Sequence, residues 1–273
     1  MRPPHPIPYQ GSKRRLAAHI LAVVDGRRYA RLYEPFAGSA ALTLAGAARG
    51  VADRFVIGDS LPALVAIWEQ ALAAPDALAA RYAQLWRRRD YAGVRAEYNA
   101  APDPARLLYL LARCVKNAPR FGPGGFNQSA DRRRLGMHPE KMRRELVAAG
   151  LLLRGRTATF AGDAEACVAS AGPRDLVYLD PPWQGTTEGA DKRYHQGFGR
   201  ARLEALLDGL NARGVPWILS YDGRSGPRTY GAPLPRALWG AHLELPAGRS
   251  SQATLSGRAE ATIESLYVSP SLG

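Results

Sequence analysis

Two kinds of hydrophobic pattern alternate along the chain. Short apolar runs bounded by turn-forming residues are typical of strands, and they lie at residues 31–34, 55–57, 158–160, 175–179 and 216–220. Between these runs, apolar residues recur at every third or fourth position, as over residues 39–49 and 200–213, which is typical of amphipathic helices. Strands that alternate with helices predict an α/β fold with a doubly wound parallel sheet.

The first two strand–helix units carry clear boundary signals. Ser39 is placed to open the first helix and Gly50 to stop it. The second strand, residues 55–57, is followed by Asp59 and then by Pro62, a residue favoured in the first turn of a helix. The repeated strand–loop–helix pattern indicates parallel strands joined by crossover helices.

The middle of the chain interrupts this alternation. Helical patterns dominate there, broken by a loop over residues 118–136 that is rich in Gly and Pro. We therefore predict a catalytic domain made of residues 1–72 and 156–273, and an inserted helical domain made of residues 73–155. At the carboxyl end we expect two strands around a turn near residues 247–257.

The positive charge is concentrated in the same middle segment. The chain has 37 Lys and Arg against 24 Asp and Glu, a net charge of +13, and residues 81–160 hold 17 basic against 6 acidic residues, or +11. Trp86 and Tyr91 lie among these arginines. Basic residues with interleaved aromatic residues favour a nucleic-acid-binding module, the alternative being a set of solvated helix faces.

Several protein classes are disfavoured by what the sequence lacks. No apolar run approaches the roughly 18 residues of a membrane span, and residues 1–9 do not read as a secretory signal. The two cysteines, Cys114 and Cys167, lack the spacing of a disulfide framework or a zinc site. We expect a soluble cytoplasmic protein without a metal.

A turn between the first strand and helix suits a nucleotide-like cofactor. Gly38 would let the backbone approach a ligand there, and Asp59, 21 residues later at the end of the next strand, is placed to accept hydrogen bonds from ribose hydroxyls. The full G-x-G-x-x-G pattern is absent, because Ser39 and Ala40 follow Gly38. A cofactor with a ribose and no pyrophosphate fits best, and S-adenosylmethionine is such a molecule.

The sharpest signal is the DPPW sequence at residues 180–183, directly after an apolar strand. Proline has no backbone N–H, so Pro181 and Pro182 would present carbonyl oxygens beside the Asp180 carboxylate. These acceptors suit an amino group conjugated to a ring, whose lone pair would then attack a methyl sulfonium. Trp183 would stack on a flipped base.

The motifs follow one another in a distinctive order. They are YQGSK at residues 9–13, EPFAGS at 34–39, GD at 58–59, GD at 162–163 and DPPW at 180–183. In this order they resemble the adenine-specific DNA methyltransferases of the Dam-like alpha group, over most of the chain. The resemblance implies a Rossmann-like S-adenosylmethionine-dependent methyltransferase sheet with an inserted helical target-recognition domain.

The resemblance also implies roles for individual residues. Those that would bind the cofactor are Tyr9, Gly11, Lys13, Phe36, Gly38, Ser39, Asp59, Asp163 and Asp180. The catalytic motif that would hold the target base is Asp180, Pro181, Pro182 and Trp183. Those that would contact nucleic acid are Arg120, Asn127, Arg132, Arg133, Arg134 and Tyr194.

Two positions depart from the family pattern. Ala40 stands where the family usually has a second glycine, which would narrow the cofactor turn, and Trp183 stands where it usually has tyrosine. The DPPW sequence also resembles adenosine methyltransferases that act on RNA.

Other methyl acceptors fit the residues less well. Ring-carbon methylation of cytosine needs a cysteine nucleophile, and neither Cys114 nor Cys167 has a suitable context. Enzymes that methylate the amino group of cytosine usually have serine where Asp180 stands, and those that methylate protein glutamine usually have asparagine.

We therefore predict a site-specific DNA methyltransferase that uses S-adenosylmethionine, without a metal, to methylate the exocyclic amino group of a flipped adenine in double-stranded DNA. The resemblance further implies a restriction-modification or related system, with a cognate restriction enzyme as a possible partner. The alternatives are an RNA adenosine methyltransferase and a catalytically silent nucleic-acid-binding protein.

Overall fold

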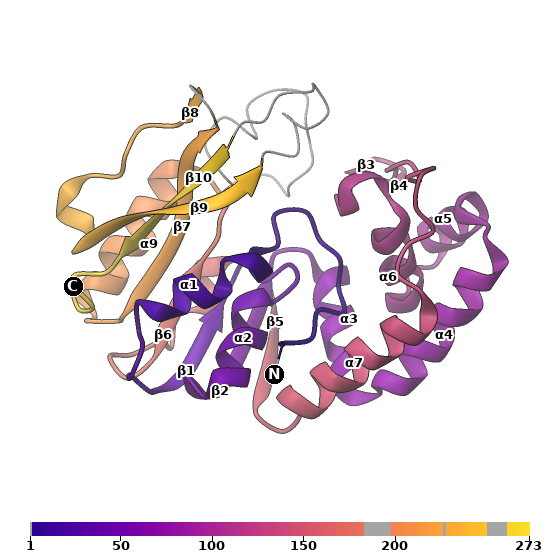
Figure 1. The fold of residues 1–273 in the computed structure, drawn as a ribbon, viewed down its shortest axis with the longest axis horizontal. Coiled ribbons are helices and arrows are strands. Elements are labelled where there is room, and N and C mark those ends of the chain that lie inside the picture. Colours follow the sequence, from indigo (N-terminus) through magenta and orange to yellow (C-terminus); the bar gives the residue numbers. More distant parts are fainter. Residues whose placement is uncertain (1, 183–197, 226–227, 250–260) are drawn as a thin grey trace.

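A mostly parallel sheet forms the centre of the protein (Figure 1). The computed structural model describes residues 2–182, 198–225, 228–249 and 261–273. Within them the strand order is β5-β2-β1-β6-β7-β10-β9, and β8 pairs with β7. The strands of this sheet are β1 (Tyr29–Glu34), β2 (Ala52–Asp59), β5 (Thr157–Ala161), β6 (Leu176–Leu179), β7 (Trp217–Ser225), β8 (Arg228–Tyr230), β9 (Ala241–Arg249) and β10 (Ala261–Val268).

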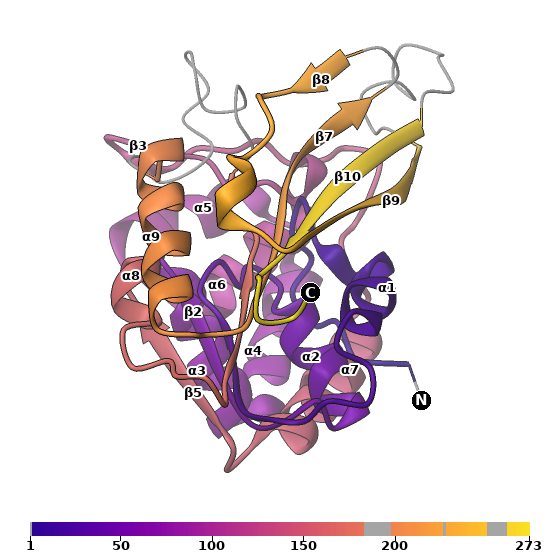
Figure 2. The same ribbon diagram turned by 90° about the vertical axis from the view of Figure 1, so that its left-hand side faces the viewer.

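Helices cover both faces of this sheet (Figure 2). One face carries α1 (Ala17–Ala22), α2 (Ala41–Arg49) and α3 (Pro62–Ala73), and the other carries α8 (Ala164–Cys167) and α9 (Arg200–Ala212). Side chains alternate accordingly, since Leu32 of β1 lies in the first core and Tyr33 in the second. The predicted α/β fold with a parallel sheet is therefore confirmed.

The strand order reverses between β1 and β6. From β1 the chain first builds outward through β2 and β5, and then returns to place β6 and β7 on the other side, all five strands being parallel. Sheets of this kind bind ligands at the carboxyl ends of the strands beside such a reversal. The segments that follow β1, β2, β5 and β6 are therefore the place to look for a site.

The carboxyl end of the chain closes the sheet with antiparallel strands. β10 pairs with β7 on one side and with β9 on the other. The two strands were predicted from the sequence, although the predicted turn between them lies mostly outside the described residues. The insertion of the later strand between β7 and β9 was not predicted.

The middle of the chain forms a group of helices beside α3 (Figure 1). They are α4 (Pro75–Arg88), α5 (Tyr91–Ala100), α6 (Pro104–Arg113) and α7 (Pro139–Leu153). α6 is buried over Leu107 to Ala112, in a core continuous with that under α2 and α3. The predicted loop at 118–136 contains a small hairpin, β3 (Phe121–Gly122) and β4 (Gly125–Phe126), which lies at the same end of the molecule as the carboxyl ends of β1 and β6 (Figure 1).

Short 3₁₀ turns link these elements. They are η1 (Lys13–Arg15), η2 (Val115–Asn117) and η3 (Arg236–Leu238). Among the residues described, no helix is long and apolar enough to cross a membrane.

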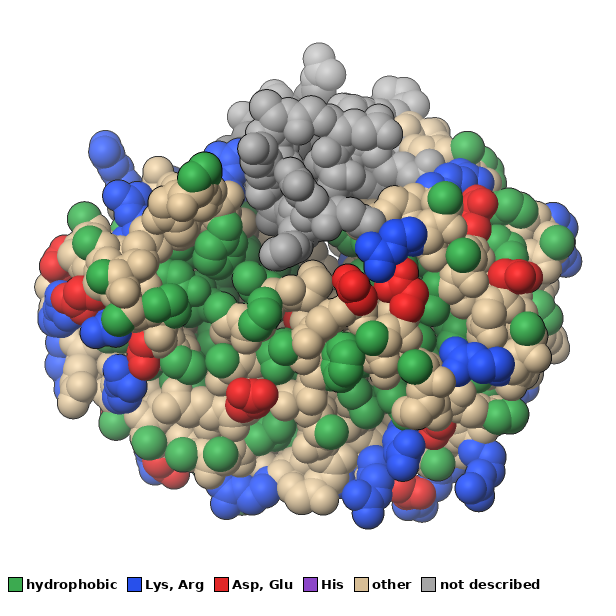
Figure 3. All heavy atoms as spheres, turned by 180° about the vertical axis from the view of Figure 1, so that it is seen from behind, with side chains coloured by type: hydrophobic (Ala, Val, Ile, Leu, Met, Phe, Trp, Pro, Cys, Tyr) green, Lys and Arg blue, Asp and Glu red, His purple; other side chains and the backbone are tan. Residues whose placement is uncertain are grey.

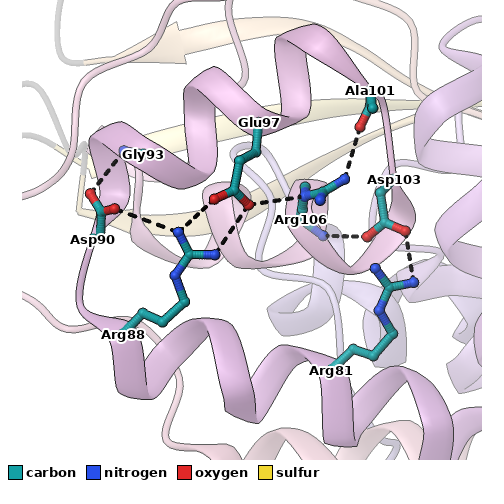
Figure 4. A network of polar contacts seen from close by, with 8 residues as sticks. All are labelled: Arg81, Arg88, Asp90, Gly93, Glu97, Ala101, Asp103 and Arg106. Carbon is teal, nitrogen blue, oxygen red and sulfur yellow. Dashed lines mark hydrogen bonds and ion pairs between the residues drawn. The ribbon is translucent and has the colours of Figure 1, made fainter.

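Many arginines of the helical segment are engaged within it (Figure 4). The carboxylate of Glu97 accepts hydrogen bonds from Arg88 and lies 3.4 Å from Nε of Arg106, and Arg81 contacts Asp103 at 2.9 Å. On the face shown in Figure 3, basic side chains lie in small groups with acidic ones among them. Part of the basic excess therefore joins helices α4, α5 and α6 rather than facing a ligand.

Candidate active site

The turn after β1 has an unusual backbone. Gly38 and Ala40 both adopt left-handed conformations, with φ of +49° and +48°. The indole N–H of buried Trp68 donates to the carbonyl of Gly38 at 3.1 Å, and the N–H of Ala37 donates to the carbonyl of Gly58 at 2.8 Å. These bonds fix the turn against α3 and β2, so its shape is set before any ligand binds.

Helix α2 begins differently from the sequence prediction. Ser39 was expected to open the helix, but the N-cap residue is Ala40, and the Ser39 hydroxyl donates to Oγ of Ser12 at 2.7 Å. The free N–H groups of the first turn are instead met by Glu34, whose carboxylate accepts from the backbone of Leu42 at 3.3 Å and Thr43 at 2.7 Å. A glutamate at the end of β1 thus replaces the side-chain cap.

Glu34 is almost completely buried, with 3% of its surface exposed. Burial raises the pKa of its carboxyl to about 7, although the hydrogen bonds from Thr43 and Leu42 act in the opposite direction. The nearby charge of Asp180 raises this pKa further. The carboxyl therefore titrates near neutral pH.

Asp59 holds the same turn from the end of β2. Its carboxylate accepts from the backbone N–H of Gly38 at 3.0 Å and from that of Leu61 at 2.9 Å. These two bonds tie the end of β2 to the turn after β1 and to the segment that leads into α3. The predicted pairing of Gly38 with Asp59 in one site is thus realised as a direct contact.

The amino-terminal segment crosses this edge of the sheet. The ring of Tyr9 packs on Gly38, where an added Cβ would lie 3.1 Å from Cδ1 of the tyrosine. The neighbouring Gln10 donates its N–H to the carbonyl of Asn117 in the helical segment at 3.0 Å. Residues 9–13 therefore touch both the turn after β1 and the helical segment, and exposed Gly11 lies in their midst.

Lys13 leads from this segment to the residue after β6. Its ammonium lies 2.8 Å from Oδ1 of Asp180 and 3.7 Å from Oε2 of Glu264 on β10. The three side chains are largely shielded from water, with exposed fractions of 8%, 19% and 13%. Burial raises the pKa of Asp180 and Glu264, and the positive charge of Lys13 opposes both shifts.

Asp180 is followed by Pro181, which is buried, and by Pro182. Neither proline has a backbone N–H, so this turn offers acceptors only. The carboxylate and these carbonyls lie at the carboxyl end of β6, beside the point where the strand order reverses. The predicted concentration of acceptors is therefore consistent with the backbone, while Trp183 lies outside the described residues.

Phe36 and Asp163 lie farther along the same edge. The ring of Phe36 meets that of Phe198 edge to face at 4.9 Å, and the guanidinium of Arg202 lies over Phe198 at 5.2 Å. Asp163 follows β5, is 69% exposed, and lies 3.7 Å from the same arginine. Its exposure leaves the carboxylate accessible to a ligand.

The predicted nucleic-acid contacts gather around the hairpin. Arg120 and Asn127 are exposed at its two ends, where the N–H of Asn127 donates to the carbonyl of Arg120 at 2.9 Å. The hairpin is held by Asn99 of α5, whose side chain bonds both the N–H and the carbonyl of Phe126. Tyr194 lies outside the described residues.

The three consecutive arginines that follow are not equivalent. Arg133 and Arg134 both contact the buried carboxylate of Asp131, the latter at 2.7 Å. Arg132 is exposed. Arg133 and Arg134 are exposed as well, and they also order the loop through Asp131.

Sequence reasoning missed Glu264. It stands in a strand where Leu266 and Val268, on the same side, lie in the apolar core. A charged residue on the apolar side of a strand is a signal of a buried polar site, and this signal was available in the sequence. Its partner Lys13 was singled out through the family resemblance.

The two cysteines are not suited to nucleophilic catalysis. Burial raises the pKa of the thiols of Cys114 and Cys167 to about 12, so neither provides a thiolate at neutral pH. Within the described ranges, no group of three or more His, Cys, Asp or Glu residues is placed to hold a metal ion.

The fold and the site together define an α/β enzyme with a nucleotide-type turn after its first strand and a buried Asp–Lys pair after its fourth parallel strand. The chain belongs to the D12 class N6 adenine-specific DNA methyltransferase family, which residues 9–238 match. It is therefore an adenine-specific DNA methyltransferase, as the sequence resemblance predicted.

The chain is also similar to two individual proteins. The retron Ec67 DNA adenine methylase of Escherichia coli is 26% identical over 209 residues, which cover 70% of this chain and 68% of that protein. The structure of the rRNA methyltransferase aviRa from Streptomyces viridochromogenes is 18% identical, with a TM-score of 0.44, over 95% of this chain and 86% of that chain. A TM-score this low supports no conclusion about substrate.

Proposed function

We propose that the protein transfers a methyl group from S-adenosylmethionine to the exocyclic amino group of an adenine flipped out of double-stranded DNA. The observation that carries this proposal is the position of Asp180, paired with Lys13 at the carboxyl end of β6, beside the turn that contains Gly38. The cofactor turn and the acceptor carboxylate thus flank the reversal of strand order.

The residues at this edge fit the cofactor. Asp59 lies at the end of β2, where a carboxylate accepts hydrogen bonds from ribose hydroxyls, and exposed Asp163 is accessible to the adenine ring. The methionine end would lie along Phe36 and Gly38, covered by Tyr9 and the segment that contains Gly11 and Lys13. The cofactor supplies an electrophilic methyl group on a sulfonium. Ser39 supports the turn through Ser12, and its contact with the cofactor stays a prediction.

The protein groups around Asp180 act on the substrate amino group. Its carboxylate accepts one N–H of the amino group and the carbonyl of Pro181 accepts the other, which draws the nitrogen towards tetrahedral geometry and frees its lone pair. The carboxylate also stabilises the positive charge that develops on this nitrogen. After transfer, it is placed to accept the proton that the methylated nitrogen releases.

The helical segment and its hairpin supply the DNA surface. Three exposed side chains near the hairpin would contact phosphates and base edges, those of Arg120, Asn127 and Arg132. Trp183 and Tyr194 stay predicted contacts of the flipped base. A role in a restriction-modification system, alone or beside a restriction enzyme, likewise stays a prediction from the family resemblance.

Replacing Asp180 with asparagine tests the assigned chemistry. Asp180→Asn keeps the size of the side chain and removes its negative charge, so methyl transfer to unmethylated genomic DNA should fall at least about 100-fold. Binding of S-adenosylmethionine, measured by calorimetry, should stay within a few-fold of that of the unmodified protein. Digestion of the product and mass identification of the nucleoside would show N6-methyladenine.

Asp208→Asn is the matched control, because Asp208 is exposed on α9 and far from this edge. It should leave the rate unchanged. Full turnover by Asp180→Asn would refute the role of the carboxylate. Product found in RNA and absent from DNA would refute the proposed substrate.

A further inference from the structure

The buried cluster at the active site contains one more carboxylate than the proposed chemistry uses. The ammonium of Lys13 lies 2.8 Å from Oδ1 of Asp180, within hydrogen-bonding distance, and 3.7 Å from Oε2 of Glu264. Oε2 of Glu264 has no hydrogen-bond partner among the described residues although it is shielded from water. Burying a carboxylate oxygen without a hydrogen-bond donor costs free energy of folding, so the presence of a glutamate at this position needs an explanation.

The sheet is built irregularly where Glu264 stands. Glu264 faces Gly223 of β7 and Leu266 faces Ser220, so two steps along β10 match three along β7. This bulge contains Asp222, which has a positive φ of 51°, and Gly223, where a Cβ would collide with the carbonyl of Ile263. The irregular part of β7 thus lies opposite Glu264, whose side chain reaches Lys13.

The reaction makes conflicting demands on Lys13. Before substrate binds, its ammonium compensates the buried charge of Asp180. During transfer, Asp180 must face an amino group that becomes positive, and an ammonium held on the same carboxylate weakens that interaction. A second anion within reach would relieve the conflict, because Lys13 would remain paired after moving away from Asp180.

We propose that Glu264 is a positioning residue that takes over the ammonium of Lys13 when Asp180 engages the substrate amino group. This inference rests on the proposed function of Asp180. The charged and titratable groups that act on Glu264 are Lys13 from η1, Asp180 after β6 and Tyr178 of β6, and Glu34 of β1 acts in turn on Tyr178. No proton or electron leaves the cluster in this step, since one ion pair replaces another.

Glu264→Gln tests the exchange, with Glu244→Gln as its control. Glu244 lies on the neighbouring strand β9 in an exposed ion pair with Arg224, so the control removes the same charge from the same sheet. The measurement is the single-turnover rate of methyl transfer to unmethylated genomic DNA from pH 5 to 9, with saturating S-adenosylmethionine. Calorimetry gives the affinity for S-adenosylmethionine and for DNA.

Glu264→Gln should lower the plateau rate about 10- to 100-fold, with both affinities within about twofold, because Lys13 stays on Asp180. The acid limb of the rate profile should move to lower pH, because removing the charge of Glu264 favours the ionised form of Asp180. A merely structural defect would lower the rate at every pH without moving this limb. Glu244→Gln should change neither.

Glu264→Asp keeps the charge on a shorter side chain and serves if the glutamine variant does not fold. Its plateau rate should lie between those of the unmodified protein and Glu264→Gln, and the acid limb of its rate profile should stay where it is in the unmodified protein. An unchanged plateau and acid limb in the folded Glu264→Gln variant would overturn this inference and leave the role of Asp180 intact. Absence of adenine methylation by the unmodified protein would instead overturn the proposed function itself.

Discussion

Three carboxylates at the carboxyl ends of the parallel strands differ in the groups that donate hydrogen bonds to them or pair with their charge. Glu34 accepts backbone N–H groups of α2, Asp59 accepts those of Gly38 and Leu61, and Asp180 is paired with the side chain of Lys13. A backbone donor cannot move without unfolding the turn, whereas a lysine side chain can. Glu34 and Asp59 therefore shape the site, while Asp180 is free to exchange its partner.

Glu34 should make the stability of the protein depend on pH near neutrality. The unfolded chain loses this proton near the ordinary glutamate value and the folded chain only near pH 7, so between these values the folded state binds more protons. The contribution is fully present below about pH 4.5 and is lost as the pH rises to 7. Over this window the unfolding free energy should fall by about 3 kcal/mol through Glu34 alone.

Urea unfolding of Glu34→Gln and the unmodified protein from pH 5 to 8 measures this effect. Asp180, Asp222 and Glu264 also have raised pKa values, so the relevant quantity is the difference between the two proteins. As the pH rises from 5 to 8, the unfolding free energy of Glu34→Gln should fall less than that of the unmodified protein. The loss of one hydrogen bond should in addition lower the stability of the variant by the same amount at every pH. The surface variant Glu140→Gln is the control, and parallel curves for all three would contradict the prediction.

At the scale of elements, helix α2 shows how a local departure is accommodated. Ala40 begins the helix with left-handed φ and ψ of 48° and 42°, a conformation that costs a non-glycine residue about 1 kcal/mol or more. The family usually has glycine at this position. The turn therefore keeps the shape that glycine favours, and the strain is offset by bonds such as that from Gly38 to Asp59.

Ala40→Gly should therefore leave the protein as stable or up to about 1 kcal/mol more stable, because relief of strain offsets the lost methyl group. The matched change Ala41→Gly removes an equally buried methyl group from the helix itself and should destabilise by about 1–2 kcal/mol. Thermal unfolding of the two variants gives the comparison. Equal losses of stability would show that Ala40 is not strained.

The elements that the sequence predicted well are those with a strong burial pattern. β6 is buried at every residue and was located by its continuous apolar run, and α9 was located by the periodic apolar face of Leu203, Leu206, Leu207 and Leu210. The hairpin was missed because its strands have two residues each and depend on Asn99, a contact between distant residues. Periodicity carries no information about such contacts.

The site was predicted to a similar degree. Residues at the ends of strands, such as Asp59 and Asp180, were identified because parallel strands place their ends along one edge. Ser39 contacts Ser12 and Arg133 contacts Asp131 in the structure, partners that short-range motifs do not reveal, and their assignment to ligands stays a prediction. Glu264 was missed although its place on the apolar side of its strand could be read from the sequence, because its contact with Lys13 depends on the order of the last strands.

At the scale of the whole molecule, the excess of positive charge has to be divided between internal pairing and a DNA surface. Arg81, Arg88 and Arg106 join helices, whereas Arg132 is exposed near the hairpin. Exposed ion pairs contribute little to the free energy of unfolding. Loss of such a pair should therefore matter less than loss of a phosphate contact, which would weaken DNA binding. The net charge of the segment alone therefore overstates its affinity for DNA.

Arg132→Glu should weaken DNA binding and reduce the slope of log affinity against log salt concentration by about 1, the effect of one lost phosphate contact. Arg54→Glu is the matched control, because Arg54 is exposed near the amino end of β2, at the edge of the sheet opposite the site. It makes the same change in net charge and should leave the slope unchanged. Equal slopes for both variants would remove Arg132 from the DNA surface.

The place of β10 has a consequence for the timing of activity. This strand is the last of the sheet in chain order, yet it lies between β7 and β9 and brings Glu264 to Lys13. While the chain is being synthesised, β7 and β9 have to wait for a partner that leaves the ribosome after both. The contact of Lys13 with Glu264 joins segments near both ends of the described chain. With Glu264 in the proposed role, methyl transfer therefore reaches its full rate only after residue 264 has been added to the growing chain.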